Sequence, residues 1–303
     1  MNVFVAGGSG TIGLPLVRAL VAAGHQVTAM TRTRSNEERL RAIGASIAIA
    51  DALDRDALAR AVAAAHPTHV VHELTALPKT GVSRASELEP TNRLRVDGTR
   101  NLLDAAVAAG AKRFLAGSFA MLAPRNSAPP DTDNPAGAAI RSMETQVLDA
   151  GTKSAIEGIV LRYGLFYGRD VPSTVNMIES VRRRRLPIVR GDSGELPLIH
   201  VDDAVAATVL ALDRAPAGAT YDIVDDRPVS LSAIVATIAE YTGAPAPWRV
   251  PAWIPRLVAP YMARLLSTRL PLSNAKARAE LGWRPEYPTI REGLVFIRRD
   301  RDT

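Results

Sequence analysis

A glycine-rich turn near the start of the chain has the residue types and spacing that hold a phosphate-bearing nucleotide. Gly7, Gly10 and Gly13 follow the apolar run Val3–Ala6 and lead into an amphipathic segment that begins at Thr11. The first glycine permits a tight turn, the second lets the backbone approach a diphosphate, and the third lets a helix pack closely on a strand. Backbone N–H groups at the start of that helix would donate to phosphate oxygens. This pattern predicts that the chain binds a dinucleotide.

The end of the second predicted strand indicates which dinucleotide is bound. An acidic residue about 20 positions after the glycines commonly binds the ribose hydroxyls of NAD. Here the strand Gln26–Thr31 continues into Arg32, and the first carboxylate is that of Glu37. The guanidinium of Arg32 can donate two charge-assisted hydrogen bonds to a 2′-phosphate, although an ordinary surface arginine is the simpler alternative. We therefore expect NADP(H) in preference to NAD(H).

Two further segments place acidic or small residues at the ends of predicted strands. Asp51 and Ala52 follow the third strand, where the Asp51 carboxylate either accepts a hydrogen bond from the adenine amino group or caps the next helix. Leu74, Thr75 and Ala76 end the fourth strand, where small residues let a cofactor lie close to the backbone. Both segments are predicted to border the cofactor.

The elements that position these residues alternate between buried strands and amphipathic helices. The predicted strands are Val3–Ala6, Gln26–Thr31, Ser46–Ala50, His69–Leu74, Arg113–Ala116 and Ile156–Arg162. The predicted helices are Thr11–Ala23, Asn36–Ile43, Arg55–Ala65, Glu87–Ala109 and Ile140–Leu148. Such alternation implies right-handed crossovers, and so an α/β fold with a Rossmann-type doubly wound parallel sheet.

The pattern becomes irregular and rich in proline beyond Tyr163. We therefore predict an NAD(P)-binding domain over residues 1–168, with later segments at about 198–224 returning to it. Residues 169–303 are predicted to form mainly a small α/β lobe that binds the substrate. Ligands of open α/β sheets bind at the carboxyl ends of the strands, so we expect this lobe to cover that edge.

Composition limits the classes of function. The chain has no cysteine, which excludes disulfides, thiolate metal sites and a cysteine nucleophile. It has no apolar run near the roughly 18 residues that cross a bilayer, and no signal peptide is recognisable. We expect a cytoplasmic protein without a membrane partner.

The positive charge of the chain does not by itself indicate nucleic acid. The net charge of +6 is spread along the sequence and lacks the interleaved aromatic residues that stack on bases. The one dense cluster is Arg182–Arg185. It is either a solvated helix end, where cations meet the negative end of the helix dipole, or a surface for an anionic substrate or partner. We do not expect nucleic acid as a partner.

Several motifs spread over the chain resemble those of the extended short-chain dehydrogenase/reductase family, the NAD-dependent epimerase/dehydratase group. They are the glycine turn, Asp51, the stretch Asp97–Leu103, the stretch Arg162–Gly168, the stretch His200–Asp203, and two pieces of the tail at Asn274–Ala277 and Glu280–Trp283. The resemblance implies a nicotinamide cofactor and places Ser118 at the family's active-site serine. Family members often pair through the helices at Glu87–Ala109 and Ile140–Leu148, which suggests a homodimer.

The chain departs from that family where the proton-transfer chemistry takes place. The family carries a Tyr-x-x-x-Lys motif on the helix after the serine, but no tyrosine precedes Tyr163 in this chain. If Glu144 is the glutamate that usually follows the motif, Ala136 and Ile140 occupy the tyrosine and lysine positions. Arg95 replaces the asparagine expected in the fourth helix. The resemblance is therefore to an atypical member that has lost the dyad.

The leading functional hypothesis is an atypical NAD(P)H-dependent oxidoreductase that acts on a small carbonyl, enone or imine compound. In the family the tyrosine moves a proton while the nicotinamide moves a hydride. Here Ser118 would polarise the substrate, and water, Tyr163 or the substrate itself would supply the proton. One alternative is a nucleotide-sugar epimerase or dehydratase. The other is a non-catalytic NADP(H)-binding regulatory or interaction protein.

The predicted site residues follow from these arguments. Cofactor binding is assigned to Gly7, Gly10, Thr11, Ile12, Gly13, Arg32, Asp51, Ala52, Leu74, Thr75, Ala76, Ser118 and Tyr163, and catalysis to Ser118 and Tyr163. His72 and His200 belong to no metal-binding motif, so they are interpreted as structural and no metal is predicted. Glu144 and Asp149 are interpreted as solvated surface residues of one helix.

Overall fold

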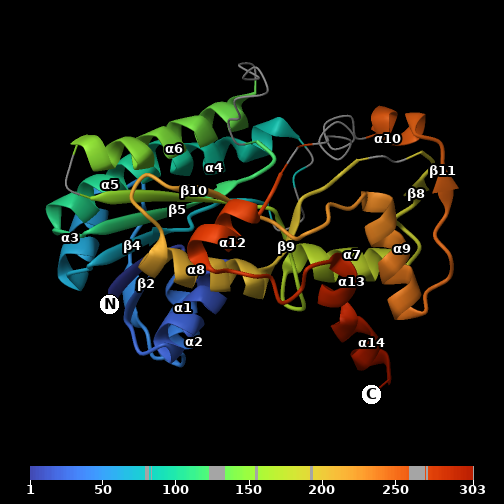
Figure 1. Cartoon of the computed structure of the whole chain (residues 1–303), viewed down its shortest axis with the longest axis horizontal. Coiled ribbons are helices and arrows are strands. Elements are labelled where there is room, and N and C mark those ends of the chain that lie inside the picture. The colour runs from blue at the N-terminus through green and yellow to red at the C-terminus, as the bar shows by residue number, and fades with distance from the viewer. Residues whose placement is uncertain are drawn as a thin grey trace.

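A parallel sheet of seven strands forms the centre of the molecule (Figure 1). The computed structural model describes residues 1–78, 82, 84–122, 134–153, 156–191, 194–258, 270 and 272–302. The strands lie in the order β10-β6-β5-β4-β1-β2-β3. Their bounds are β1 Asn2–Ala6, β2 Gln26–Thr31, β3 Ser46–Ile49, β4 His69–His72, β5 Arg113–Phe119, β6 Glu157–Tyr163 and β10 Thr220–Ile223. The order reverses between β1 and β4, which is where ligands of doubly wound folds bind.

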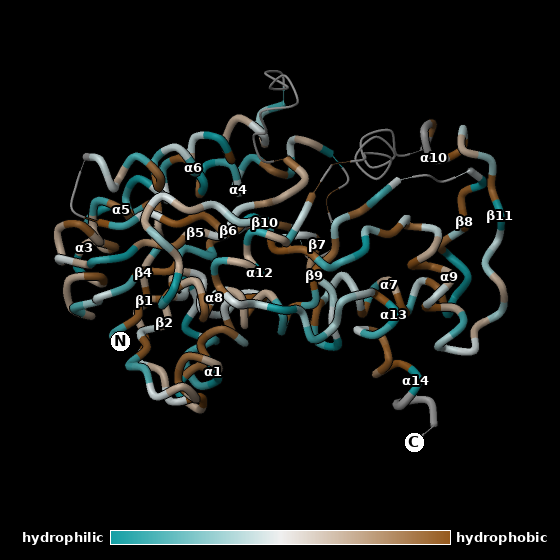
Figure 2. Tube along the Cα trace, in the orientation of Figure 1, coloured by the Kyte–Doolittle hydropathy of each residue, from teal (hydrophilic) through white to brown (hydrophobic). Residues whose placement is uncertain are grey.

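Helices cover both faces of this sheet (Figure 1). One face carries α1 (Gly13–Ala22), α2 (Glu37–Arg41) and α8 (Val201–Arg214), whose apolar residues share a core with Val3, Leu115 and Leu161. The other carries α3 (Arg55–Ala65), α5 (Thr99–Ala108) and α6 (Pro135–Lys153), which share a second core with Phe4 and Phe114. Because helices cover both faces, the strands are apolar on both sides, and the trace is brown along β5 and β6 in Figure 2.

The rest of the chain forms a second lobe beyond the carboxyl edge of the sheet (Figure 1). Its elements are β7 Leu165–Tyr167, α7 Pro172–Arg182, β8 Ile188–Val189, β9 Leu198–His200, α9 Leu231–Thr242, β11 Arg249–Val250, α10 Trp253–Val258, α12 Ala275–Leu281, α13 Ile290–Gly293 and α14 Val295–Asp302. Strand β7 pairs with β9, and β8 pairs with β11. Helix α12 lies on α8 and β10 rather than with the lobe. The division into domains at residue 168 stays a prediction.

The predicted α/β doubly wound fold is confirmed, and one predicted helix is wrong in detail. The stretch Glu87–Ala109 is not a single α-helix. It contains a 3₁₀ turn at Ala85–Leu88, α4 at Glu89–Arg93, a π-helical turn at Leu94–Gly98, and then α5. The π turn adds a residue to the helical repeat, and Gly98 at its end fits closely beside Ala52. Arg95 lies within this turn and is buried.

Local signals set several helix ends as the sequence indicates. Asp54 caps α3 by accepting a hydrogen bond from the Ala57 N–H at 3.0 Å. Gly24, Gly44 and Gly110 follow helices in left-handed conformations, with φ of 80°, 94° and 76°. Among the described helices, none has both the length and the apolar composition of a membrane span.

Candidate cofactor and active site

The turn after β1 has the geometry of an anion cradle. Gly7 adopts a left-handed φ of 89°, and the Gly10 N–H donates to its carbonyl at 2.9 Å. A Cβ on Gly13 would overlap the carbonyl oxygen of Gly7, so the turn excludes any side chain there. Helix α1 begins without a side-chain cap at Ile12, whereas α3 is capped by its own aspartate. The free N–H groups and the helix dipole fit a diphosphate.

A cluster of neutral polar groups follows β2 in place of a carboxylate. Thr31 is buried, and its Oγ1 accepts hydrogen bonds from Asn36 Nδ2 at 3.1 Å and from the Thr33 N–H at 3.3 Å. The hydroxyl of Ser9, from the glycine turn, lies 3.2 Å from the same oxygen. Arg32 is exposed beside the cluster. Sequence analysis missed Ser9 and Asn36, because neither residue type is distinctive without its neighbours in space.

The segments after β3 and β4 are fixed by backbone and side-chain hydrogen bonds. Asp51 is exposed, and one of its oxygens accepts the Leu53 N–H at 2.9 Å; the cap of α3 is Asp54, not Asp51. The carbonyl of Ala52 accepts from Asn101 Nδ2 at 2.9 Å. The Ala76 N–H donates to Thr91 Oγ1 at 2.9 Å. The contact between Asp51 and adenine stays a prediction.

Ser118 lies on the α6 face of the sheet as the first member of a buried polar chain. Its hydroxyl donates to Glu144 Oε1 at 2.6 Å. The same carboxylate accepts Arg162 Nε at 2.9 Å and Nη2 at 2.6 Å. Glu144 is 2% exposed, so its interpretation as a solvated surface residue is wrong. Because Ser118 has one hydrogen and gives it to Glu144, it can only accept hydrogen bonds from a neighbouring ligand.

The two positions of α6 that match the missing dyad carry buried apolar side chains. Ala136 is 3% exposed and Ile140 is 0% exposed. They lie on the same helix face as Glu144, two turns and one turn before it, because four residues make about one turn. Neither can carry a proton. This part of the described structure therefore offers a hydrogen-bond acceptor but no proton donor.

Tyr163 lies on the opposite face of the sheet from Ser118. It is 3% exposed and packs in the core that α1 and α8 share with the sheet. Its hydroxyl lies 3.1 Å from Glu73 Oε1 and 2.7 Å from Thr208 Oγ1. Burial raises the pKa of Tyr163 well above its usual value, and burial likewise raises the pKa of Glu73 to about 8. The position of the Tyr163 hydroxyl does not suit it to protonate a substrate beside Ser118.

The two histidines singled out in the sequence are both held in structural roles. His72 is 1% exposed, its Nε2 lies 2.8 Å from Thr99 Oγ1, and burial lowers its pKa to about 4, so it is neutral. His200 Nδ1 accepts the Asp202 N–H at 3.3 Å and thereby caps α8. Among the described residues, no group of three metal-ligating side chains is assembled.

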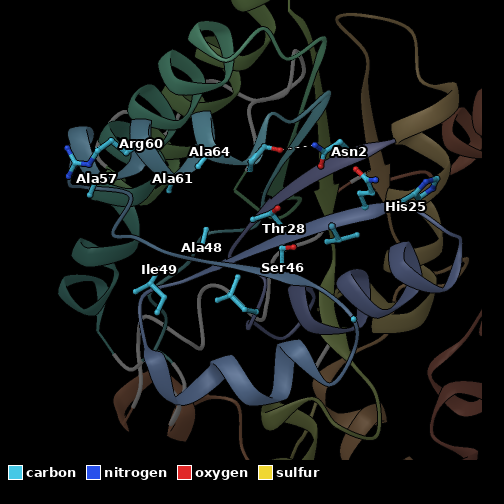
Figure 3. A pocket seen from close by; sticks show the side chains of 15 residues that line it. Asn2, His25, Thr28, Ser46, Ala48, Ile49, Ala57, Arg60, Ala61 and Ala64 are labelled. Carbon is cyan, nitrogen blue, oxygen red and sulfur yellow. Dashed lines mark hydrogen bonds between the residues drawn. The ribbon is translucent and has the colours of Figure 1, made fainter.

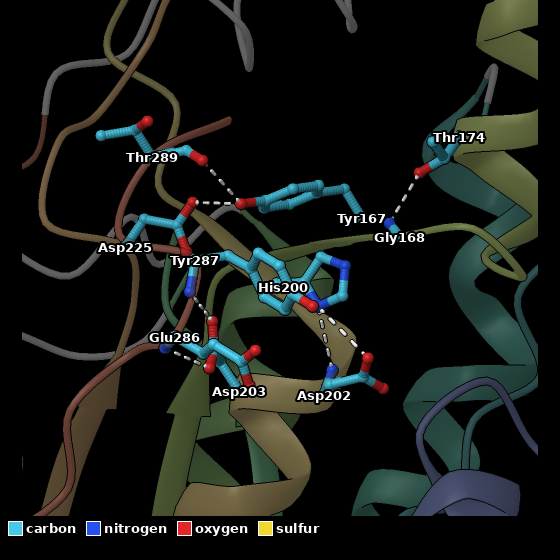
Figure 4. A network of polar contacts seen from close by, with 10 residues as sticks. All are labelled: Tyr167, Gly168, Thr174, His200, Asp202, Asp203, Asp225, Glu286, Tyr287 and Thr289. Atoms are coloured by element: carbon cyan, nitrogen blue, oxygen red, sulfur yellow. Dashed lines mark hydrogen bonds and ion pairs between the residues drawn. The ribbon is translucent and has the colours of Figure 1, made fainter. Parts of the chain in front are cut away.

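A polar network around His200 joins the second lobe to the sheet (Figure 4). The His200 ring stacks on Tyr287 with centroids 4.1 Å apart. The Tyr167 hydroxyl donates to Asp225 Oδ2 at 2.9 Å and to the Thr289 carbonyl at 3.3 Å. Asp203 accepts backbone N–H groups from the same C-terminal segment. The network fixes the lobe but contributes none of the predicted site residues.

A separate groove of about 910 Å³ lies between α3 and the β2–β3 side of the sheet (Figure 3). Its lining includes Thr28, Ser46, Ile49 and Arg60. None of the predicted cofactor or catalytic residues lines it. The groove is therefore distinct from the candidate site.

Comparison with known proteins agrees with this geometry. Residues 3–224 match the model of the NAD dependent epimerase/dehydratase family. A Streptomyces sp protein named 3-diazoavenalumate denitrifying reductase is 38% identical, over 97% of this chain and 99% of its own length. A Stigmatella aurantiaca ketoreductase of a farnesyl dihydroquinoline oxide is 27% identical, over 99% of this chain and 96% of its own length.

Solved structures repeat the fold. The UDP-glucose 4-epimerase of Thermus thermophilus, in complex with NAD, superimposes with a TM-score of 0.78. The superposition covers 100% of this chain and 98% of the epimerase, at 24% sequence identity. At that identity the likeness establishes the fold alone.

Proposed function

This chain belongs to the NAD dependent epimerase/dehydratase family and is an NAD(P)-dependent oxidoreductase, and from that premise we propose that it is an NADPH-dependent reductase of a small electrophile. The cofactor would supply a hydride, and Gly7, Gly10 and Gly13 would hold its diphosphate. The reduction needs no proton from the protein. The observation that carries this proposal is the absence of a donor around Ser118: its hydrogen is given to Glu144, and the described positions of the dyad are apolar.

The preference for NADPH rests on the groups that follow β2. A carboxylate at this point would repel a 2′-phosphate, whereas Ser9, Thr31 and Asn36 provide neutral hydroxyl and amide groups. Arg32 adds an exposed guanidinium next to them. Charge-assisted hydrogen bonds from a guanidinium to phosphate contribute about 1.5–3 kcal/mol each.

Replacing Arg32 with alanine is expected to weaken NADPH binding by about tenfold or more and to leave NADH binding nearly unchanged, because only NADPH carries the 2′-phosphate. Isothermal titration of both cofactors measures the change. Arg60→Ala, an exposed arginine of α3, is the matched control and should bind both cofactors as the unchanged protein does. An equal loss for both cofactors would remove the argument for Arg32.

The missing donor separates the candidate substrates. Reduction of a carbonyl makes an alkoxide that must gain a proton, and reduction of an enone makes an enolate with the same need. An imine is reduced readily only once it is protonated, and it then brings its own proton. An arenediazonium ion needs none: the hydride pair forms the new C–H bond, and the C–N bonding pair leaves with N₂. We infer that a cationic acceptor of the diazonium type suits this site best.

The name of the Streptomyces relative supports the same class. That protein is called a denitrifying reductase of a diazo compound, and it matches nearly the whole chain. Ser118, as an acceptor, would offer oxygen lone pairs to the positive group of such a substrate, held in place by Glu144. A carbonyl oxygen would instead meet two lone pairs and be repelled.

The direct test is a substrate panel. NADPH consumption would be followed with an arenediazonium salt, an imine, an aldehyde and an enone, and N₂ release would be measured with the first. Denatured protein controls for direct reduction of the diazonium ion by NADPH. Enzyme-dependent N₂ release is the expected result; activity on the aldehyde alone would support the carbonyl hypothesis instead.

Ser118→Ala sharpens this test. With the diazonium substrate we expect a loss of only a few-fold, because the serine gives up no proton and makes one weak contact. A serine that polarises a carbonyl would lose about 100-fold or more in kcat, as oxyanion donors do. No turnover across the panel, with intact NADPH binding, would favour a regulatory protein, and interconversion of UDP-sugars would favour an epimerase.

A further inference from the structure

Glu73 is a carboxyl group placed under the cofactor turn, where neither sequence nor family resemblance predicts a function for it. Its N–H donates to the Ala6 carbonyl at 2.9 Å, which fixes the residue beside β1. A Cβ on Gly117 would overlap the Glu73 carboxyl oxygens, so that carboxyl occupies the space of a missing side chain on β5. A Cβ on Gly7 would lie 2.6 Å from the Glu73 carbonyl oxygen. The residue therefore touches the turn that is built for a diphosphate.

The hydrogen bonds below Glu73 require a hydrogen from it. Thr208 Oγ1 donates its hydrogen to the Ala204 carbonyl at 2.7 Å. The 2.7 Å contact between Tyr163 and Thr208 must then use the hydrogen of the Tyr163 hydroxyl. The 3.1 Å contact between Tyr163 and Glu73 Oε1 is a full hydrogen bond only if Glu73 supplies the hydrogen. A neutral carboxylic acid completes this chain, and a carboxylate leaves it one hydrogen short.

We propose that Glu73 must be a neutral carboxylic acid for the dinucleotide to bind, so that ionisation of Glu73 opposes cofactor binding. The inference rests on the proposed dinucleotide site. Its physical basis is Coulomb repulsion: a buried carboxylate would add a negative charge beneath the diphosphate, in a place with few solvent molecules to screen it. Glu73 is thus a residue that determines cofactor affinity and does not touch the substrate.

The surroundings of Glu73 contain one other titratable group among the described residues. Tyr163 faces it from β6, and burial keeps the pKa of that hydroxyl well above its usual range. The turn after β1 presents Gly7, strand β5 presents Gly117, and α8 presents Thr208 behind the tyrosine, none of which is charged. His72 is neighbouring in sequence but bonds Thr99 on the other face of the sheet. Between pH 7 and 9.5, then, Glu73 is the described group at this place whose charge changes.

The sign of the effect follows from linkage. Burial raises the pKa of Glu73 to about 8, and an anionic ligand above it would raise the pKa further. The form that binds the cofactor is thus the protonated one, so affinity is constant below about pH 7.5 and falls above it. The limit is about tenfold per pH unit, which is one proton linked to one binding event. A 2′-phosphate has its second pKa near 6 and does not change charge in this range.

The test is the dissociation constant of NADPH from pH 6 to 9.5 for the full chain and for Glu73→Gln. Glutamine keeps the shape and supplies a donor to Tyr163, but it cannot ionise. The unchanged protein should lose affinity above pH 8, by about tenfold at pH 9.5, while Glu73→Gln stays flat. Parallel profiles in the two proteins would overturn the proposal. Absence of NADPH binding at every pH in the unchanged protein would instead refute the dinucleotide site itself.

Proton uptake gives a second reading that does not depend on the variant. Binding of NADPH at pH 8.5 in weak buffer should take up a fraction of one proton per cofactor, detected with a pH indicator. At pH 6.5 the same titration should leave Glu73 unchanged. Zero uptake at pH 8.5 with saturating NADPH would contradict the coupling.

Discussion

Replacing Arg162 with methionine is expected to lower the free energy of unfolding by about 3–5 kcal/mol, because it leaves the Glu144 carboxylate buried without its cation. Arg162 and Glu144 join β6 to α6 through two charge-assisted hydrogen bonds, and their side chains are only 15% and 3% exposed. Denaturant unfolding followed by circular dichroism measures the change.

The double variant Arg162→Met with Glu144→Leu is the control for that prediction. Removing both charges leaves no uncompensated ion, and apolar pairs of similar volume often equal a buried ion pair in stability. The double variant should therefore recover most of the lost stability. If it unfolds as readily as Arg162→Met alone, the cost lies in lost packing and not in the unpaired carboxylate.

Gly13→Ala is expected to weaken NADPH binding by about 100-fold or more, because the new methyl group would overlap the carbonyl of Gly7. The backbone cannot move aside without opening the turn that presents its N–H groups. Titration of the purified variant measures the loss, and circular dichroism checks that the sheet is still formed.

Gly137→Ala provides the matched glycine substitution. Gly137 lies in α6, and the nearest atom to an added Cβ is Arg141 Nη1 at 3.5 Å, an ordinary contact. This variant should bind NADPH normally and gain slightly in stability, since alanine is the better helix former by about 1 kcal/mol. Equal loss of binding in both variants would show that the Gly13 effect is not specific to the turn.

Sequence reasoning reached the parts of the fold that local pattern determines. The strands β1 and β2 are continuous apolar runs, and their bounds agree with prediction within a residue. The glycine turn is also local, since all its parts lie within seven consecutive positions. Caps and left-handed glycines were predictable for the same reason.

The parts that were missed depend on which elements become neighbours. Glu144 is two turns beyond Ala136 on an amphipathic helix, and only the packing of α6 on β6 reveals Arg162 as its partner. Glu73 likewise meets Tyr163 from a strand 90 positions later. One signal was available: Glu144 repeats the helix face of the buried Ala136 and Ile140, so an inward position could have been inferred. The π turn has no such signal, because a single added residue barely changes the apolar repeat.

The origin of the hydrogen in the product tests the central claim most directly. The reaction would be run with NADPH deuterated at the transferable position and an arenediazonium salt in ordinary water, and again with ordinary NADPH in D₂O. Hydride transfer without a protein proton donor predicts one deuterium at the carbon that held N₂ in the first reaction and none in the second. Deuterium taken from D₂O, or no enzyme-dependent product in either reaction, would contradict the account.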